Sequence, residues 1–217
     1  MAMLFSLAAM WGTPPAQAGD ISTPSLTGIF SQASFGTLPI AVRWLAPGAT
    51  IVNSALAIID NDEEITALYA AAPIEFPVLS VFFVDTVKFC GSAGVFSGCA
   101  QIRGYDSLVA SGFASAASGD VHIARGIGHN LGLVEDSTVG NLMHPFPAAG
   151  ATTLTQAQAD TILQNQGDLL QIAADGSIFI ELRPIAVVAS VPEPAAWLLF
   201  GCGLTVLGAF ARRRRVH

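Results

Sequence analysis

Two short apolar runs, bounded by proline, glycine or charged residues, predict β-strands in the first half of the chain. They are residues 38–45 (LPIAVRWL) and 78–85 (VLSVFFVD), both rich in β-branched or aromatic side chains. We expect the second run, which is almost wholly apolar, to be a central strand. Between them, residues 61–72 (NDEEITALYAAA) begin with acidic side chains and then place apolar residues on one helical face. The pattern therefore predicts the order strand, helix, strand.

Further elements follow in the second half of the chain. Residues 106–111 (DSLVAS) predict a strand, which we place at a sheet edge. Such an edge either takes up an extended peptide substrate or is an ordinary solvent-exposed edge, and we favour the second. Residues 118–120 supply turn and capping chemistry ahead of a helix. Thr155 and Gln158 have capping-box spacing before another helix, and residues 177–185 predict the last strand.

The charge balance excludes a role in nucleic-acid binding. The chain has 9 basic and 16 acidic residues, and its formal net charge is −7. Four of the basic residues are the arginines at 212–215, so the rest of the chain has little positive charge with which to neutralise phosphates.

The cysteines indicate an oxidising compartment. Cys90 and Cys99 flank the glycine-rich segment GSAGVFSG, which can close as a short disulfide-bonded loop, whereas Cys202 lies in an apolar tail. Free thiols at the first two positions are the alternative. We favour the disulfide, provided that the protein is exported.

The N-terminal residues 1–18 are predicted to be a signal peptide. They combine the apolar stretch MLFSLAAMW with the small-residue ending AQA. The segment lacks a basic n-region, so either the true start lies upstream or the segment is a disordered apolar arm. We favour the signal peptide.

The C-terminal residues 187–217 form a stalk and a tail of three parts. A VPEP sequence is followed by 17 uncharged residues, 195–211, and then by the arginine cluster. An apolar helix of this length with a basic end predicts a membrane anchor whose basic side is cytoplasmic. The order of parts closely resembles the PEP-CTERM sorting signal of Gram-negative bacteria. That resemblance implies an exosortase as processing partner, transient membrane anchoring, and delivery to the outer surface or extracellular matrix. The residues of the sorting motif are Val191, Pro192, Glu193 and Pro194.

The segment 124–143, ARGIGHNLGLVEDSTVGNLM, contains part of a zinc-binding pattern. In the pattern H-E-x-x-H-x-x-G-x-x-H, two histidines one turn apart reach one metal ion, and the glutamate is the general base. The glycine ends the helix so that a third histidine reaches the same ion. Here His129, Gly132 and the downstream Met143 take expected places. The places of the first histidine, the glutamate and the third histidine are taken by Arg125, Gly126 and Glu135.

These matches make the segment similar to the active-site helix and Met-turn of metzincin-like zinc metallopeptidases, whose usual wording is close to AHEIGHNLGLxHD followed by NLM. The resemblance implies a zincin-like fold with Met143 in the turn. The matching residues are Ala124, Ile127, Gly128, His129, Asn130, Leu131, Gly132, Leu133, Asp136, Asn141, Leu142 and Met143.

The residues that depart from the pattern affect metal binding and catalysis. Arg125 has no lone pair with which to coordinate zinc, and Gly126 supplies no general base, so no catalytic set is intact. His129 and Glu135 remain weak metal candidates. The alternative for His129 is a partly buried histidine with one hydrogen bond. We expect no bound metal, and zinc enters only through the resemblance.

The departing residues suggest a replacement for the metal. Arg125 and Glu135 are predicted to face the same pocket, where a bidentate ion pair can stand in for the ion. A solvated Arg125 is the alternative. Gly126 either admits a close neighbour such as a crossing strand or is a loss of helix stability that is tolerated after a catalytic role has gone. His122 and His144 are interpreted as ordinary polar residues.

We therefore expect an α+β, zincin-like fold at residues 19–186, with a mixed twisted sheet, an active-site-type helix and a Met-turn, followed by a C-terminal apolar helix. The predicted function is that of an exported surface or matrix pseudopeptidase that binds a peptide or surface polymer or has a structural role. The alternatives are an active zinc endopeptidase with an atypical site and a matrix component selected only for its sorting tail.

Overall fold

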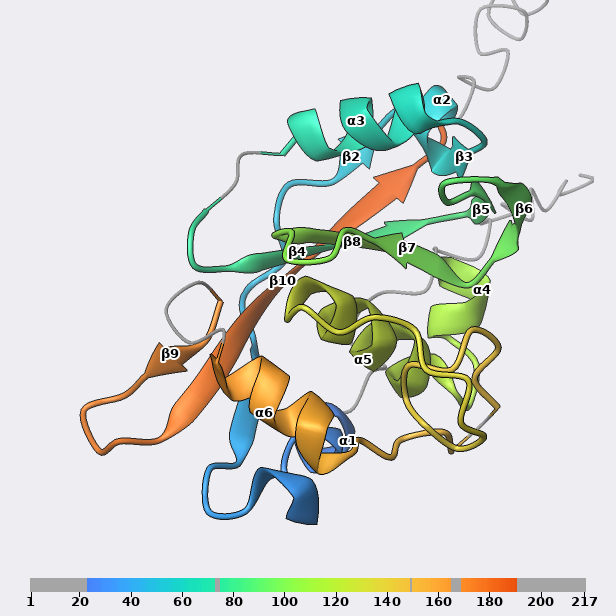
Figure 1. Ribbon diagram of the computed structural model, residues 1–217. Helices are drawn as coiled ribbons and strands as arrows, with labels where there is room; N and C mark the ends of the chain where they lie inside the picture. Colours follow the sequence, from blue (N-terminus) through green and yellow to red (C-terminus); the bar gives the residue numbers. More distant parts are fainter. Residues whose placement is uncertain (1–22, 73–74, 149, 165–168, 191–217) are drawn as a thin grey trace, which may run out of the picture.

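A mixed β-sheet runs through the described part of the chain, which comprises residues 23–72, 75–148, 150–164 and 169–190 of a computed structural model (Figure 1). Its main strand order is β1-β10-β4-β8-β7. The first four of these strands are parallel to their neighbours, and β7 is antiparallel to β8. The strands are β1 (Ile40–Trp44), β10 (Ile178–Val188), β4 (Leu79–Val84), β8 (Asp106–Ala110) and β7 (Gly98–Ala100).

The prediction of a central strand at residues 78–85 is confirmed, and the prediction of an edge strand at residues 106–111 is wrong. All six residues of β4 are buried, and β4 pairs with both β10 and β8, as expected for the run at 78–85. β8 was expected at an edge, but all five of its residues are buried and it pairs on both sides. The edge strand next to β8 is β7, which includes Cys99 and which the apolar pattern did not mark as a strand.

The C-terminal strand β10 lies inside the sheet, between β1 and β4. It continues to Val188, beyond the predicted end at residue 185, because Val187 and Val188 pair with β2 (Ile51–Val52). Its first residues pair with the short antiparallel strand β9 (Gln171–Ile172). The last strand of the described chain is thus an internal strand of the main sheet.

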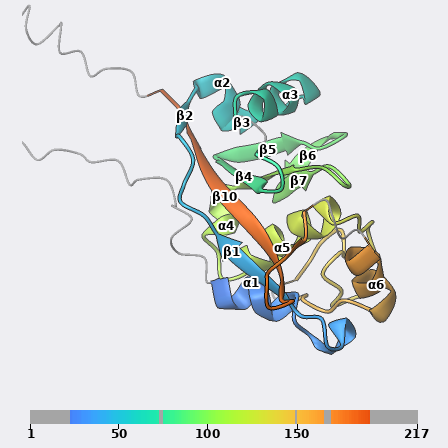
Figure 2. The same ribbon diagram turned by 90° about the vertical axis from the view of Figure 1, so that its left-hand side faces the viewer.

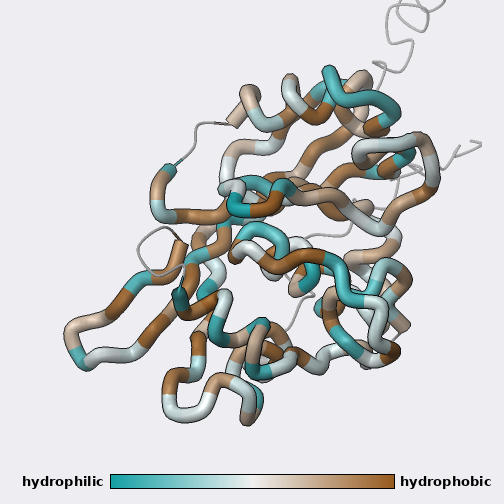
Figure 3. Tube along the Cα trace, viewed as in Figure 1, coloured by the Kyte–Doolittle hydropathy of each residue, from teal (hydrophilic) through white to brown (hydrophobic). Residues whose placement is uncertain are grey.

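Helices cover both faces of the sheet (Figures 1 and 2). On β4, Val81 and Phe83 belong to the core shared with helices α1, α5 and α6, whereas Phe82 and Val84 belong to the core shared with α2 and α3. This alternation follows from the two-residue period of a strand. Hydrophobic residues are accordingly concentrated in the strands at the middle of the molecule (Figure 3). The sheet therefore separates two apolar cores.

The helix predicted from residues 61–72 is α3 (Asp62–Ala70). Its N-cap is Asn61, whose side-chain oxygen accepts a hydrogen bond from the Glu64 backbone N–H, and the Glu64 carboxylate accepts one from the backbone N–H of Asp60. The remaining elements are α1 (Thr23–Ile29), the 3-10 helix η2 (Ala33–Phe35), α2 (Ser54–Ala57), β3 (Ile58–Ile59), β5 (Thr86–Phe89), β6 (Ala93–Phe96), α4 (Ser111–Ala114), α5 (Gly119–Asn130) and α6 (Gln156–Gln164).

The targeting segments predicted from the sequence lie outside the described residues. These are the signal peptide at 1–18, the sorting motif at 191–194 and the apolar helix at 195–211. Within the described ranges, none of the helices has the length and apolar character that a membrane span requires.

A disulfide joins Cys90, which follows β5, to Cys99 in the edge strand β7. It therefore links the small sheet β3-β5-β6 to the edge of the main sheet.

We predict that the double substitution Cys90→Ser, Cys99→Ser lowers the free energy of unfolding by about 2–3 kcal/mol, because the unfolded chain regains the freedom of a short closed loop. Urea unfolding measures the loss. The control is the same double variant with and without reductant, which we expect to unfold identically. A wild-type protein whose midpoint is unchanged by reductant would contradict the prediction.

Candidate functional site

Helix α5 places three polar side chains on one face. Its opposite face packs on the sheet through Val121, Ile123, Ala124 and Ile127, all buried in the core that α5 shares with β4. Because positions three and four residues apart share a helical face, the side away from the sheet carries the half-buried His122, Arg125 and His129 together. The burial of one stripe thus fixes the direction of the three polar residues.

α5 ends at Asn130, and Gly132 lies just beyond its C-cap residue Leu131, where the pattern places a helix-ending glycine. The backbone N–H of Gly132 donates to the carbonyl of His129, and that of Leu133 donates to the carbonyl of Gly128, each at 2.9 Å. Gly132 has a φ of 95°, which glycine adopts at little cost. These bonds form a Schellman motif, which turns the chain back toward the helix so that Glu135 reaches Arg125.

Met143 is fully buried and packs against α5 at Gly128. A Cβ atom added at Gly128 would lie 2.6 Å from its sulfur, so the helix and the turn approach each other as closely as a glycine allows. The turn also contains Asn141, whose side-chain oxygen accepts a hydrogen bond from the Met143 N–H at 2.8 Å. Met143 and Asn141 thus lie in one turn that packs beside α5.

Gln158, which the sequence predicts only as part of a helix cap, also holds the turn that contains Asn141 and Met143. Gln158 of α6 and Asn141 form a reciprocal amide pair, with N–O distances of 2.9 and 3.2 Å. The same Gln158 amide oxygen accepts the backbone N–H of Thr155, and the Thr155 hydroxyl accepts the N–H of Gln158, which completes the predicted capping box. The capping spacing is local and visible in the sequence, but the pairing with Asn141 joins residues 17 positions apart.

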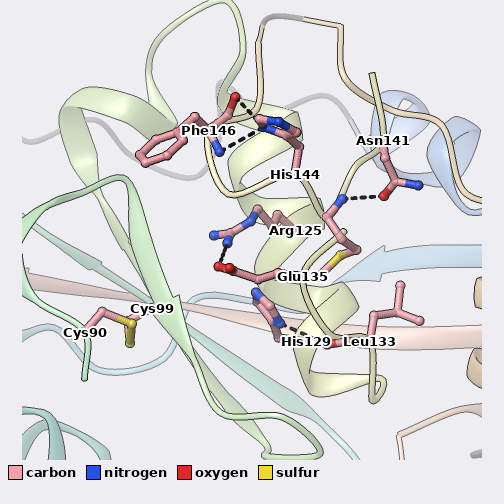
Figure 4. Close-up of polar contacts among 10 residues, drawn as sticks. Cys90, Cys99, Arg125, His129, Leu133, Glu135, Asn141, His144 and Phe146 are labelled. Atoms are coloured by element: carbon pink, nitrogen blue, oxygen red, sulfur yellow. Dashed lines mark hydrogen bonds and ion pairs between the residues drawn. A yellow bond between two sulfur atoms is a disulfide. The ribbon is translucent and has the colours of Figure 1, made fainter. Parts of the chain in front are cut away.

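Arg125 and Glu135 form an ion pair with an N–O distance of 2.7 Å (Figure 4). One nitrogen and one oxygen take part, so the bidentate geometry suggested from the sequence is not present. The Arg125 side chain is 15% exposed and that of Glu135 is 58% exposed. Burial lowers the pKa of Arg125, and the neighbouring Glu135 partly opposes this shift. The pair therefore joins a largely desolvated cation to a solvated carboxylate.

His129 has the hydrogen bond expected of a partly buried histidine. Its Nδ1 lies 2.9 Å from the carbonyl oxygen of Leu133, and because a carbonyl only accepts, Nδ1 carries the proton. Burial lowers the pKa of His129, so the ring is neutral near pH 7 and its lone pair is on Nε2. In Figure 4 the ring lies next to Glu135 and Arg125.

The polar face of α5 lines a pocket of about 720 Å³. His122, Arg125, His129 and Glu135 all contribute to it. The sequence analysis treated His122 as an ordinary polar residue, yet it shares this pocket with His129; its Nε2 is 3.4 Å from the Ser118 hydroxyl, and burial lowers its pKa. The remaining walls come from the segment that joins β6 to β7, from α4 and from the residues that follow the Met143 turn. They contain Cys90, Val95, Phe96, Ser97, Gly98, Cys99, Ala100, Ile102, Phe113, Pro145, Phe146 and Pro147.

His144 is not part of this pocket. Its Nδ1 contacts the backbone of Phe146, at 3.0 Å from the carbonyl oxygen and 3.1 Å from the nitrogen. This local contact agrees with the interpretation of His144 as an ordinary polar residue.

The residues at the proposed metal position do not fit zinc. The guanidinium of Arg125 occupies the place of the first ligand and cannot coordinate, and Glu135 is engaged with it. Across the described ranges, no group of three or more His, Cys, Asp or Glu side chains is arranged to hold a metal ion.

Gly126 at the general-base position lies over Ser107 of β8, so a crossing strand is indeed its neighbour. An added Cβ would lie 3.4 Å from the Ser107 Cβ, an ordinary contact, and therefore space does not require a glycine here.

Comparison with known proteins identifies the C-terminal tail. Residues 190–215 match the PEP-CTERM protein-sorting motif. This motif indicates an exported protein of a Gram-negative bacterium that an exosortase sorts to the cell surface. No curated protein and no solved structure matches the chain. The resemblance to metzincin-like peptidases rests on residues 124–143 and stays a proposal.

We predict that Gly128→Ala lowers the free energy of unfolding by about 1–3 kcal/mol, because its methyl group would collide with the buried Met143 sulfur. Urea unfolding is the measurement. Gly112→Ala in α4 is the control, since no atom lies within 4 Å of its added Cβ. Equal stability of the two variants would show that the turn moves freely away from the helix.

A double-mutant cycle of Arg125→Met and Glu135→Gln tests the ion pair. We predict a coupling of about 0.5–1 kcal/mol that becomes smaller in high salt, because Glu135 is more than half exposed. Urea unfolding at low and high sodium chloride measures it. A salt-independent coupling above about 2 kcal/mol would indicate a desolvated pair and contradict the prediction.

Proposed function

We propose that this exported, surface-sorted protein is a pseudopeptidase, whose metzincin-like domain binds a ligand in the pocket beside α5 and does not hydrolyse it. The observation that carries the proposal is the 2.7 Å ion pair between Arg125 and Glu135. These residues stand at the first and third metal-ligand positions of the zinc-binding pattern. An arginine in direct contact with the carboxylate there replaces the cross-link of a metal ion by a salt bridge.

The chemistry of hydrolysis supports the same conclusion. A zinc peptidase needs a bound ion to polarise water and a base to take its proton. With glycine at position 126 and arginine at position 125, neither requirement is met by the residues of the helix. The neutral His129 retains a lone pair, but a single imidazole makes a weak metal site.

Features around the helix support the metzincin-like part of the proposal. Gly132 follows the C-cap of α5 with a positive φ, and the fully buried Met143 packs against the helix at Gly128. The antiparallel edge strand β7 borders the pocket. In peptidases of this type, such an edge is where an extended substrate is laid. A domain with this arrangement retains a binding cleft without a catalytic centre.

The rival function is an active zinc endopeptidase with an atypical site. The observation that favours it is the presence of His122 and His129, both neutral, in one pocket. It needs a third ligand and a base from outside the helix.

The test compares the native chain with the triple substitution Arg125→His, Gly126→Glu, Glu135→His. We predict that the native chain holds no stoichiometric zinc and does not cleave casein, whereas the triple variant gains about one zinc per chain and measurable proteolysis, because it regains three ligands and a base. Metal analysis by mass spectrometry and a casein assay are the measurements.

A fourth substitution, His129→Gln in the triple variant, is the matched control and should remove both gains. Stoichiometric zinc in the native chain, or equal proteolysis by native chain and triple variant, would favour the active enzyme and sink the proposal.

A further inference from the structure

The positive charge in the pocket has a counterion that is held weakly. The Arg125 side chain is largely buried, but it meets Glu135 through one N–O contact only. Because most of the Glu135 side chain is exposed, water can solvate its carboxylate if it turns away, whereas Arg125 stays in place. An incoming carboxylate is therefore able to exchange with Glu135.

Two further polar atoms, which belong to residues that line the pocket, lack a partner. The Arg125 Nε and the His122 Nδ1 are buried and have no hydrogen-bond partner among the described residues. Both residues line the same pocket. A guanidinium Nε always donates, and a neutral imidazole can place its proton on Nδ1. Since unsatisfied buried donors cost free energy, a ligand with two acceptor oxygens would stabilise this region.

The walls of the pocket around Arg125 and His122 are apolar and exposed to solvent. Val95 of β6 is 80% exposed and Phe146, which follows the Met143 turn, is 86% exposed. Ile102 and Phe113, which also line the pocket, are exposed as well. Exposed apolar residues gathered around one concavity are typical of a binding site. The ligand should therefore join a carboxylate to a large apolar group.

The edge strand β7 indicates the kind of molecule that carries this carboxylate. Gly98, Cys99 and Ala100 line the pocket, and within the described ranges no strand pairs with the outer edge of β7. The disulfide at Cys99 anchors this strand to the end of β5. A free, anchored edge offers backbone hydrogen bonds to an extended chain. A polypeptide fits this wall better than an isolated acid does.

We propose that the pocket binds the free C-terminus of a polypeptide that ends in a large apolar residue, with its carboxylate on Arg125 in place of Glu135. Arg125 and His122 then donate to the two carboxylate oxygens, the last side chain lies among the apolar walls, and the preceding backbone runs along β7. This inference rests on the proposed function, because the carboxylate takes the position that a metal ion would occupy in an active enzyme.

The first experiment compares three probes by calorimetry on the full chain: acetyl-Ala-Ala-Phe as the free acid, the same peptide as C-terminal amide, and 3-phenylpropionic acid. We expect the peptide acid to bind at least about tenfold more tightly than the amide, as a charged hydrogen bond predicts. We also expect it to bind more tightly than phenylpropionic acid, which lacks the backbone groups for β7.

The second experiment tests the exchange of counterions with single substitutions. Arg125→Met should weaken binding of the peptide acid at least about tenfold. Glu135→Gln should tighten it by about threefold or more, because the competing carboxylate is gone. Glu75→Gln is the matched control: Glu75 pairs with Arg183, is 51% exposed and does not line the pocket, so affinity should not change. A purely structural role for Glu135 would not produce tighter binding.

Three outcomes overturn the inference: equal binding of acid and amide, equal binding of phenylpropionic acid, or an unchanged or weaker affinity in Glu135→Gln. The affinity of Glu135→Gln tests the inference even if the Arg125→Met variant does not fold. Zinc is measured in the same preparations. Stoichiometric zinc would overturn the proposed function itself, whereas zinc-free protein without a preference for the acid overturns only this inference.

Discussion

The close packing of α5 between the sheet and the Met143 turn is the constraint on which the rest of the site depends. Gly128 lets the Met143 sulfur approach the helix, and Val121, Ile123 and Ile127 are buried in the core on the sheet. A helix held on these sides has one face left for polar residues. The pocket and its charge follow from that geometry, because His122, Arg125 and His129 on the remaining face line one pocket together with β7 and the residues after the turn.

The charge on that face gives the site its proposed character. A cation removed from water needs a partner, and the partner here is a carboxylate that is itself largely in water. Such an arrangement keeps a fixed positive charge in the pocket and an exchangeable negative charge at its rim. Under the proposed function, the protein retains the shape of a cleft that receives peptides, while its chemistry changes from metal-assisted hydrolysis to the recognition of an anion.

The disulfide bond agrees with the export of the protein that its sorting motif indicates. The PEP-CTERM motif at residues 190–215 indicates export and sorting to the surface. The disulfide between Cys90 and Cys99 is suited to that oxidising environment and ties together the wall of the pocket. β10 ends at Val188, in register with β2, only two residues before the motif begins. The sorting tail therefore starts almost directly from the middle of the main sheet.

Local chemistry determined what the sequence by itself predicted correctly: the apolar runs of β1 and β4, the acidic start of α3, the capping residues Thr155 and Gln158, and the helix-ending Gly132. Each depends on neighbours within a few positions, so the pattern contains the necessary information. The tertiary structure alone decided that β8 is internal, that β10 enters the sheet between β1 and β4, and that His122 shares the pocket of Arg125. These depend on pairing between segments far apart in the chain, and a period of two or 3.6 residues says which face is buried but not against which partner.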